Sequence, residues 1–98
     1  MRRAARLDNN HHAVVSALRS IGASVQSLAS MGGGVPDLVV GFRGRNILLE
    51  VKDGEEPPSA RALTADERDW HAKWAGQVAV VKTPEEAQLA VIDGANIG

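Results

Sequence analysis

Two acidic residues and one lysine form a possible catalytic set in this sequence. Asp37 precedes a first apolar run, and Glu50 and Lys52 lie two positions apart at the end of a second one. Carboxylate oxygens are typical ligands of Mg²⁺ and Mn²⁺. Such a cation polarises a phosphoryl oxygen and acidifies a bound water, while a neighbouring ammonium orients that water or neutralises the developing charge. These residue types therefore predict a Mg²⁺- or Mn²⁺-dependent site that cleaves phosphodiester bonds.

A β-hairpin would bring the three residues together. The two apolar runs flank Gly44, which allows the positive φ that a two-residue turn needs. Side chains alternate along a strand, so Glu50 and Lys52 share one face. A turn at residues 43–44 places Asp37 opposite Glu50, and a turn shifted by one residue places it opposite Lys52. With either turn, all three side chains lie on the same face of the hairpin.

The alternative interpretation is a surface hairpin with an incidental Glu-x-Lys pair. The opposite face of the predicted hairpin is apolar and is expected to pack against the core; it consists of Leu38, Val40, Phe42, Ile47, Leu49 and Val51. On the polar face, Val39 and Leu48 alternate with the charged residues. This mixture favours a partly buried cleft over a solvated surface.

In this segment the sequence resembles the PD-(D/E)xK nuclease superfamily. Pro36-Asp37 matches the PD element, and Glu50-Val51-Lys52 matches the E-x-K element. Within the superfamily the chain is similar to the virus-type replication-repair nuclease (VRR-NUC) family, in its short stand-alone form found in phages. The similarity covers most of the chain and includes Asp8-Asn9-Asn10, residues 32–38, residues 50–54, Pro57-Pro58-Ser59 and Leu63-Thr64.

The resemblance implies a DNA endonuclease that depends on Mg²⁺ or Mn²⁺. In such an enzyme Asp37, Glu50 and the backbone carbonyl of Val51 bind the metal ion, and Lys52 is the catalytic base or the group that orients water. Asp8 is a further candidate ligand, because parts of the superfamily place a helix-borne acid at the metal. Family members are associated with branched DNA, and stand-alone viral members with Holliday junctions. The implied fold is a restriction-endonuclease-like αβββαβ core.

Six further residues are candidate DNA contacts. They are Gly33 and Gly34 before the catalytic aspartate, Arg43 and Arg45 at the hairpin tip, and Ser59 and Arg61 in the following loop. Glycine allows a nucleic-acid backbone to approach closely, and arginine and serine bind phosphate oxygens. The alternatives are loop flexibility for the glycines and a solvated surface for the other residues.

The histidines and tryptophans have structural interpretations. His11 lies on the apolar stripe of the first predicted helix, where similar sequences often have Gln, and packing is its expected role. His71 follows Glu67 by four residues on one helix face, but no role for it follows from the sequence. Trp70 and Trp74 have the same spacing, which favours core packing or a dimer surface over stacking on a base.

The pattern of apolar residues predicts the element order αβββαβα in a single domain, residues 1–98. Asp8 is the expected N-cap of the first helix, and Thr64 with Glu67 forms a capping box for the second. The predicted helices are 8–21, 64–75 and 84–92. The predicted strands are 23–28, the two hairpin strands and a buried strand at 77–82. Residues 53–62 are predicted to be an irregular exposed loop. This order is consistent with a central mixed sheet flanked by helices.

Charge is distributed unevenly along the 98 residues, although the formal net charge is only −1. Residues 1–52 contain seven Lys or Arg and three acids, whereas residues 53–98 contain four and nine. The basic half holds the candidate site, which is compatible with phosphate binding. The chain has no cysteine, so disulfides and thiolate sites are excluded.

The sequence also predicts a location. Residues 1–6 resemble the start of a signal peptide, but polar residues follow where an apolar stretch would be required. No segment is long and apolar enough to span a membrane. We therefore expect a cytoplasmic protein, in a bacterial host if the chain is encoded by a phage.

A homodimer is the expected working form. A four-way DNA junction has two equivalent strands related by a two-fold axis, which a symmetric dimer would match. The candidate interface residues are Trp70, Trp74, Val91 and Ile92. Two alternatives to a DNA endonuclease remain at this point: a non-catalytic nucleic-acid-binding module on the nuclease fold, and an RNA-directed nuclease.

Overall fold

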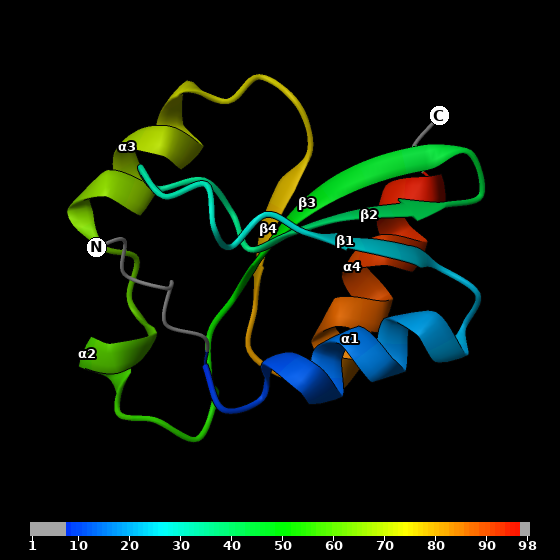
Figure 1. Cartoon of the computed structure of the whole chain (residues 1–98), viewed down its shortest axis with the longest axis horizontal. Coiled ribbons are helices and arrows are strands. Elements are labelled where there is room, and N and C mark those ends of the chain that lie inside the picture. Colours follow the sequence, from blue (N-terminus) through cyan, green and yellow to red (C-terminus); the bar gives the residue numbers. More distant parts are fainter. Residues whose placement is uncertain (1–7, 97–98) are drawn as a thin grey trace.

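A mixed four-stranded β-sheet forms the centre of the protein (Figure 1). The computed structural model describes residues 8–96. The strands, in spatial order, are β1 (Ser24–Ser27), β2 (Leu38–Phe42), β3 (Arg45–Val51) and β4 (Val78–Val81). The helices are α1 (His11–Ser20), α2 (Pro58–Arg61), α3 (Ala65–Lys73) and α4 (Pro84–Asn96). Strands β1, β2 and β3 are antiparallel neighbours, and β4 runs parallel to β3. The predicted mixed sheet with flanking helices is confirmed.

The turn between β2 and β3 consists of Arg43 and Gly44. Both residues have positive φ, 52° and 79° respectively, and the flanking Phe42 pairs with Arg45. Two successive positive φ values suit the twist of a tight hairpin, and glycine adopts them without strain. Of the two predicted registers, the structure has the one that places Asp37 opposite Glu50.

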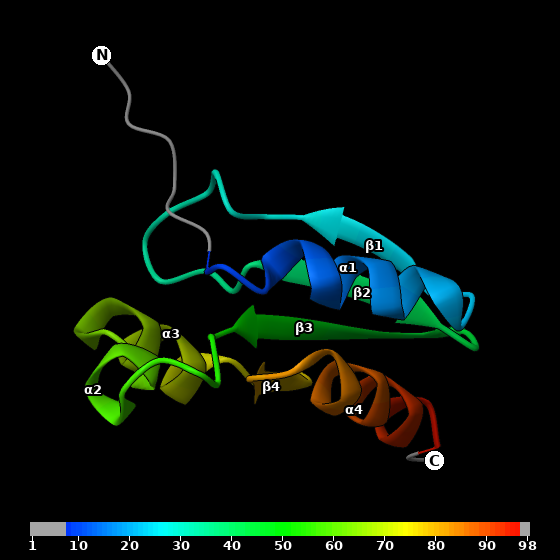
Figure 2. The same cartoon turned by 90° about the horizontal axis from the view of Figure 1, so that it is seen from below.

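Helices α1 and α4 lie side by side over one face of the sheet, which we call the closed face (Figure 2). The core lies between these helices and the sheet. Its buried residues include Val14 and Leu18 of α1, Val91 of α4, and the predicted apolar face of the hairpin except Phe42, which is partly buried and packs against the core. The apolar stripe of α1 and the alternation along the hairpin therefore meet in one hydrophobic core.

The opposite face of the sheet, the open face, is only partly covered. Helices α2 and α3 lie toward one end of the sheet (Figure 1). Trp70 of α3 and Trp74, which directly follows this helix, line a groove together with Val39 and Leu48. Val80 of β4 is 36% exposed. The prediction of a fully buried last strand is therefore wrong, because β4 lies at the sheet edge and one of its sides faces the open face.

Several predicted boundaries also differ from the structure. Helix α1 begins at His11 and not at Asp8, and α3 ends at Lys73, before the predicted stop at Gly76. Helix α4 continues to Asn96. The predicted irregular loop contains α2, a single helical turn that has proline at its start, where the missing N–H is no loss.

The N-terminal residues that entered the predictions lie outside the described residues. They are Leu7 of the apolar stripe and the arginines Arg2, Arg3 and Arg6. Between residues 8 and 96, no helix has the length and apolar character needed to cross a membrane.

Candidate active site

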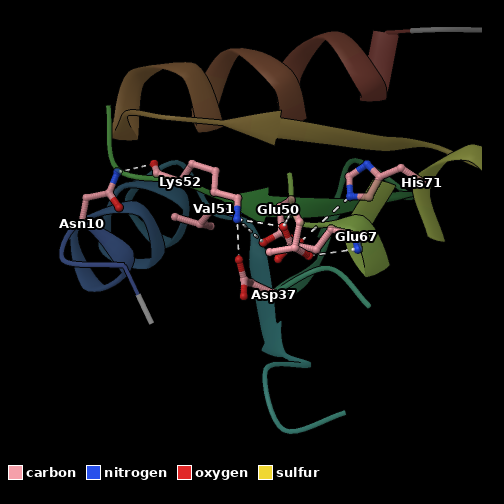
Figure 3. A network of polar contacts seen from close by, with 8 residues as sticks. Asn10, Asp37, Glu50, Val51, Lys52, Glu67 and His71 are labelled. Carbon is pink, nitrogen blue, oxygen red and sulfur yellow. Dashed lines mark hydrogen bonds and ion pairs between the residues drawn. The ribbon is translucent and has the colours of Figure 1, made fainter. Parts of the chain in front are cut away.

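The ends of β2 and β3 are joined by the carboxylate of Asp37. Its Oδ2 accepts a hydrogen bond of 2.8 Å from the backbone N–H of Val51 (Figure 3). The strand register, continued by two residues, places Pro36 opposite Val51. Proline has no N–H, so this position donates no ladder hydrogen bond to the Val51 carbonyl. The N–H of Val51 therefore donates to the side chain of Asp37, and the carbonyl of Val51 lies opposite a proline that cannot donate to it.

A cavity of about 520 Å³ opens at this point, and all three residues of the predicted catalytic set line it. Its lining consists of Asp8, Asn9, Asp37, Glu50, Lys52, Asp53, Glu56, Ala60, Thr64 and Glu67. Most of these side chains are acidic. The structure thus brings the predicted carboxylates and the lysine together. The sequence did not indicate that Asp53, Glu56 and Glu67 also line the cavity.

Glu50 is the most perturbed of these groups. Its side chain is only 3% exposed. Burial raises its pKa from the ordinary 4.5 to about 9, and the nearby carboxylates of Asp37 and Glu67 act in the same direction. An acidic cluster without a bound cation therefore holds Glu50 protonated at neutral pH.

Lys52 is held by an acid from another element. Its Nζ donates a 2.9 Å hydrogen bond to Glu67 Oε1 and lies 3.9 Å from Glu50 Oε2. Burial alone would lower the pKa of Lys52, but the hydrogen bond to Glu67 and the surrounding negative charges raise it. The same hydrogen bond lowers the pKa of Glu67 despite burial. The two side chains therefore form a charged pair.

Glu67 is fixed by its place at the start of α3. The predicted capping box is present: Thr64 Oγ1 accepts from the Glu67 N–H, and Glu67 Oε1 accepts from the Thr64 N–H. That oxygen therefore binds both the helix end and Lys52. The sequence reveals the capping box, but the capping role by itself gives no reason to place Glu67 in the site.

His71 lies one helical turn after Glu67 and faces Glu50. Its Nε2 lies 4.0 Å from Glu50 Oε1. Burial lowers the pKa of the imidazole, so the ring is neutral at pH 7. The i, i+4 spacing of Glu67 and His71 is the signal in the sequence that points to a shared surface.

The segment before α1 closes another side of the cavity. Asp8 lines it, and burial raises the pKa of this carboxyl. The prediction of Asp8 as N-cap is wrong: the N-cap position belongs to Asn10, whose side chain makes no cap hydrogen bond. Instead, the Asn10 amide donates to the carbonyls of Lys52 (3.0 Å) and Lys82 (2.9 Å). Asp8 is therefore not the helix cap, and it lines the cavity instead.

The candidate DNA contacts lie in different places. Arg43 and Arg45 are exposed at the hairpin tip, about 20 Å along β3 from the end that carries Glu50. Ser59 and Arg61 belong to α2, whose Ala60 lines the cavity. Only the second pair is close to the carboxylates.

Gly33 and Gly34 differ from each other although both have positive φ, 65° and 85°. A Cβ at Gly33 would have open space around it, whereas a Cβ at Gly34 would overlap the backbone of Asp66 in α3. Gly34 therefore allows the loop to pack against α3, and Gly33 is the one that a ligand can approach.

The two tryptophans, Trp70 in α3 and Trp74 directly after it, lie outside the core. Trp70 and Trp74 stack with ring centroids 4.6 Å apart, and Trp74 is 46% exposed. Of the two predicted roles, core packing is therefore excluded for Trp74, and a dimer surface stays a prediction. The prediction of Val91 as a candidate interface residue is wrong, because its side chain is only 1% exposed and lies in the core. His11 is buried, as its place on the apolar stripe predicts.

No preformed metal site is present in the described part of the chain: no three His, Cys, Asp or Glu side chains between residues 8 and 96 are arranged to hold a metal ion by themselves. Comparison with known proteins found no protein-family model, curated protein or solved structure that matches this chain.

Proposed function

We propose that this protein is a Mg²⁺- or Mn²⁺-dependent endonuclease that hydrolyses phosphodiester bonds in DNA. The observation that carries the proposal is the convergence of Asp37, Glu50 and Lys52 on one cavity. The fold class is consistent with a restriction-endonuclease-like core, and the motif resemblance to the VRR-NUC family remains part of the proposal.

The donor groups fit a hard divalent cation. Mg²⁺ in phosphoryl-transfer sites usually takes one or two carboxylates, several waters and substrate oxygens, so three protein side chains are not required. Asp37, Glu50 and the Val51 carbonyl, which Pro36 leaves without a ladder donor, would hold the ion, and Asp8 is a further candidate. A bound cation also counteracts the burial and the repulsion between carboxylates that raise the pKa of Glu50. The ion would polarise a phosphoryl oxygen and acidify a water.

The remaining residues have electrostatic and positioning roles. Lys52 is a charged hydrogen-bond donor beside Glu50, so it is suited to orient water and to neutralise charge that develops on the phosphate. Its pairing with Glu67 favours this role over that of a catalytic base, because a base must first lose the proton. Glu67 keeps the ammonium at the cavity.

Branched DNA such as a Holliday junction is the proposed substrate, and it rests on the family resemblance. Of the predicted DNA contacts, we propose that Ser59 and Arg61, on the helix whose Ala60 lines the cavity, contact nearby phosphates, and that Arg43 and Arg45 contact more distant ones. A basic N-terminal half supports binding to a polyanion.

A two-fold dimer is the proposed assembly on such a substrate, with the exposed Trp74 as the candidate interface residue. Sedimentation equilibrium of the protein with and without a junction measures this. A 10.3 kDa monomer under both conditions would contradict the dimer and leave the nuclease proposal intact.

The test of function is cleavage of a panel of branched, flapped, duplex and single-stranded DNA and of RNA, with Mg²⁺, Mn²⁺ or a chelator. We expect divalent-dependent cutting of branched DNA, which Asp37→Asn abolishes. Asp69→Asn, which neutralises an exposed acid on α3, is the matched control and should cut normally. Cleavage by Asp37→Asn would contradict the proposal. DNA binding without cleavage would favour the non-catalytic module, and cutting of RNA alone would favour the RNA-directed nuclease.

A further inference from the structure

His71 is not among the proposed metal ligands, yet its ring faces one of them. His71 Nε2 and Glu50 Oε1 are 4.0 Å apart. Both atoms are buried, and neither has a hydrogen-bond partner in the part of the chain that the structure describes. The two side chains are 13% and 3% exposed, so bulk water has little access to them. Buried polar atoms without a hydrogen-bond partner are energetically unfavourable. We therefore expect another state of the protein in which these two atoms are hydrogen-bonded.

The two carboxylate oxygens of Glu50 lie near different residues. Oε2 is 3.9 Å from Lys52 Nζ, whereas Oε1 lies toward His71. An ionised carboxylate can only accept hydrogen bonds, and a neutral imidazole with its proton on Nε2 donates one. A movement of about 1 Å would bring the pair to ordinary N–H···O distance. Carboxylates that bind a metal are themselves commonly hydrogen-bonded to a second residue that fixes their orientation.

We propose that His71 is a positioning residue for Glu50, donating a hydrogen bond from Nε2 to Oε1 when a divalent cation is bound. This inference rests on the proposed nuclease function. Helix α3 would then orient two residues of the site, because Glu67 on its preceding turn accepts a hydrogen bond from Lys52. One face of α3 then orients both charged residues at the end of β3 (Figure 3).

The test compares His71→Asn with His71→Gln. The side-chain amide of Gln extends one carbon further and reaches toward the position of Nε2, whereas that of Asn does not. His12→Asn, the same change at an exposed histidine of α1, is the matched control. For each variant, Mn²⁺ affinity is measured by electron paramagnetic resonance, cleavage is measured against Mn²⁺ concentration, and stability is measured by urea unfolding.

We expect His71→Asn to weaken Mn²⁺ binding by roughly 10- to 100-fold, with a cleavage rate at saturating Mn²⁺ close to that of the wild type. His71→Gln should restore most of the affinity, and His12→Asn should have no effect. Unchanged Mn²⁺ affinity in His71→Asn would overturn the inference while leaving the nuclease proposal standing. Equal losses in the Asn and Gln variants that follow their loss of stability would also overturn it. A wild-type protein that neither binds Mn²⁺ nor cuts DNA would overturn both.

Discussion

Leu49 and Glu50 are neighbours on β3, but they face opposite sides of the sheet. Both are almost completely buried, at 0% and 3% exposure. Leu49 on the closed face lies in the hydrophobic core, whereas Glu50 on the open face lies among Asp37, Lys52 and His71. Burial stabilises the first residue and disfavours the charged form of the second. The open end of β3 therefore retains an arrangement that folding alone does not favour, which is typical of a functional site.

The largest expected effect is that of Lys52→Ala, on the open face, on the rate of DNA cleavage. Loss of the ammonium should lower the rate of DNA cleavage by about 10³-fold, because charge that develops on the phosphate loses a preorganised donor. Mn²⁺ affinity should change little. Single-turnover cleavage measures the rate, and Lys82→Ala, which removes a partly exposed lysine after β4, is the control. Full activity of Lys52→Ala would refute the role given to this residue.

The closed face is tested by the pair Leu49→Ala and Leu48→Ala. Leu49 is fully buried in the core, so its truncation should lower the free energy of unfolding by about 3 kcal/mol. Leu48 is half-buried on the open face, so its loss should be about 1 kcal/mol. Urea unfolding measures both values. Similar losses at the two positions would mean that the open face is packed as tightly as the closed one.

Glu50→Gln should stabilise the metal-free protein. The pKa of Glu50 in the folded protein, about 9, is above the ordinary 4.5, so the folded state binds more protons than the unfolded chain between these pH values. The free energy of unfolding therefore falls as pH rises through this range, and the uncharged Gln removes that loss.

We expect the gain from Glu50→Gln to grow with pH, to a few kcal/mol at pH 8, and to be close to zero at pH 4.5. Urea unfolding at both pH values, with a chelator present, is the measurement. A gain that does not depend on pH would show that the carboxyl is not the cause.

The smallest effect concerns the loop between β1 and β2, which packs against α3. Gly33→Ala and Gly34→Ala both place a side chain at positive φ, but only the second also overlaps the backbone of Asp66. We expect Gly34→Ala to lower the free energy of unfolding by about 1 kcal/mol more than Gly33→Ala does. Thermal unfolding of the two variants provides the difference, and an equal loss in both would place Gly34 away from α3.

The half of the site that local rules determine was predictable from the sequence. Alternation along the hairpin and the positive φ at Gly44 together place Asp37, Glu50 and Lys52 on one face for either turn. The other half depends on how α3 docks after a long connection, and no local rule specifies that. Glu67 has a sufficient local explanation as part of a capping box, and His71 has none, so neither indicates a site without the tertiary structure. Asn10 is similar, because its partners are distant carbonyls.

The two hydrogen bonds of Asn10 have a consequence for the order of folding. Its amide joins carbonyls of residues that lie 42 and 72 positions further along the chain. Contacts over such separations must overcome the entropy of closing a long loop, so we expect them to form late in folding. The parallel pairing of β3 with β4 requires α2 and α3 to cross over beforehand. A nascent or truncated chain therefore holds Asp8, Lys52 and Glu67 in separate segments, and the complete set of charged residues exists only in the finished fold.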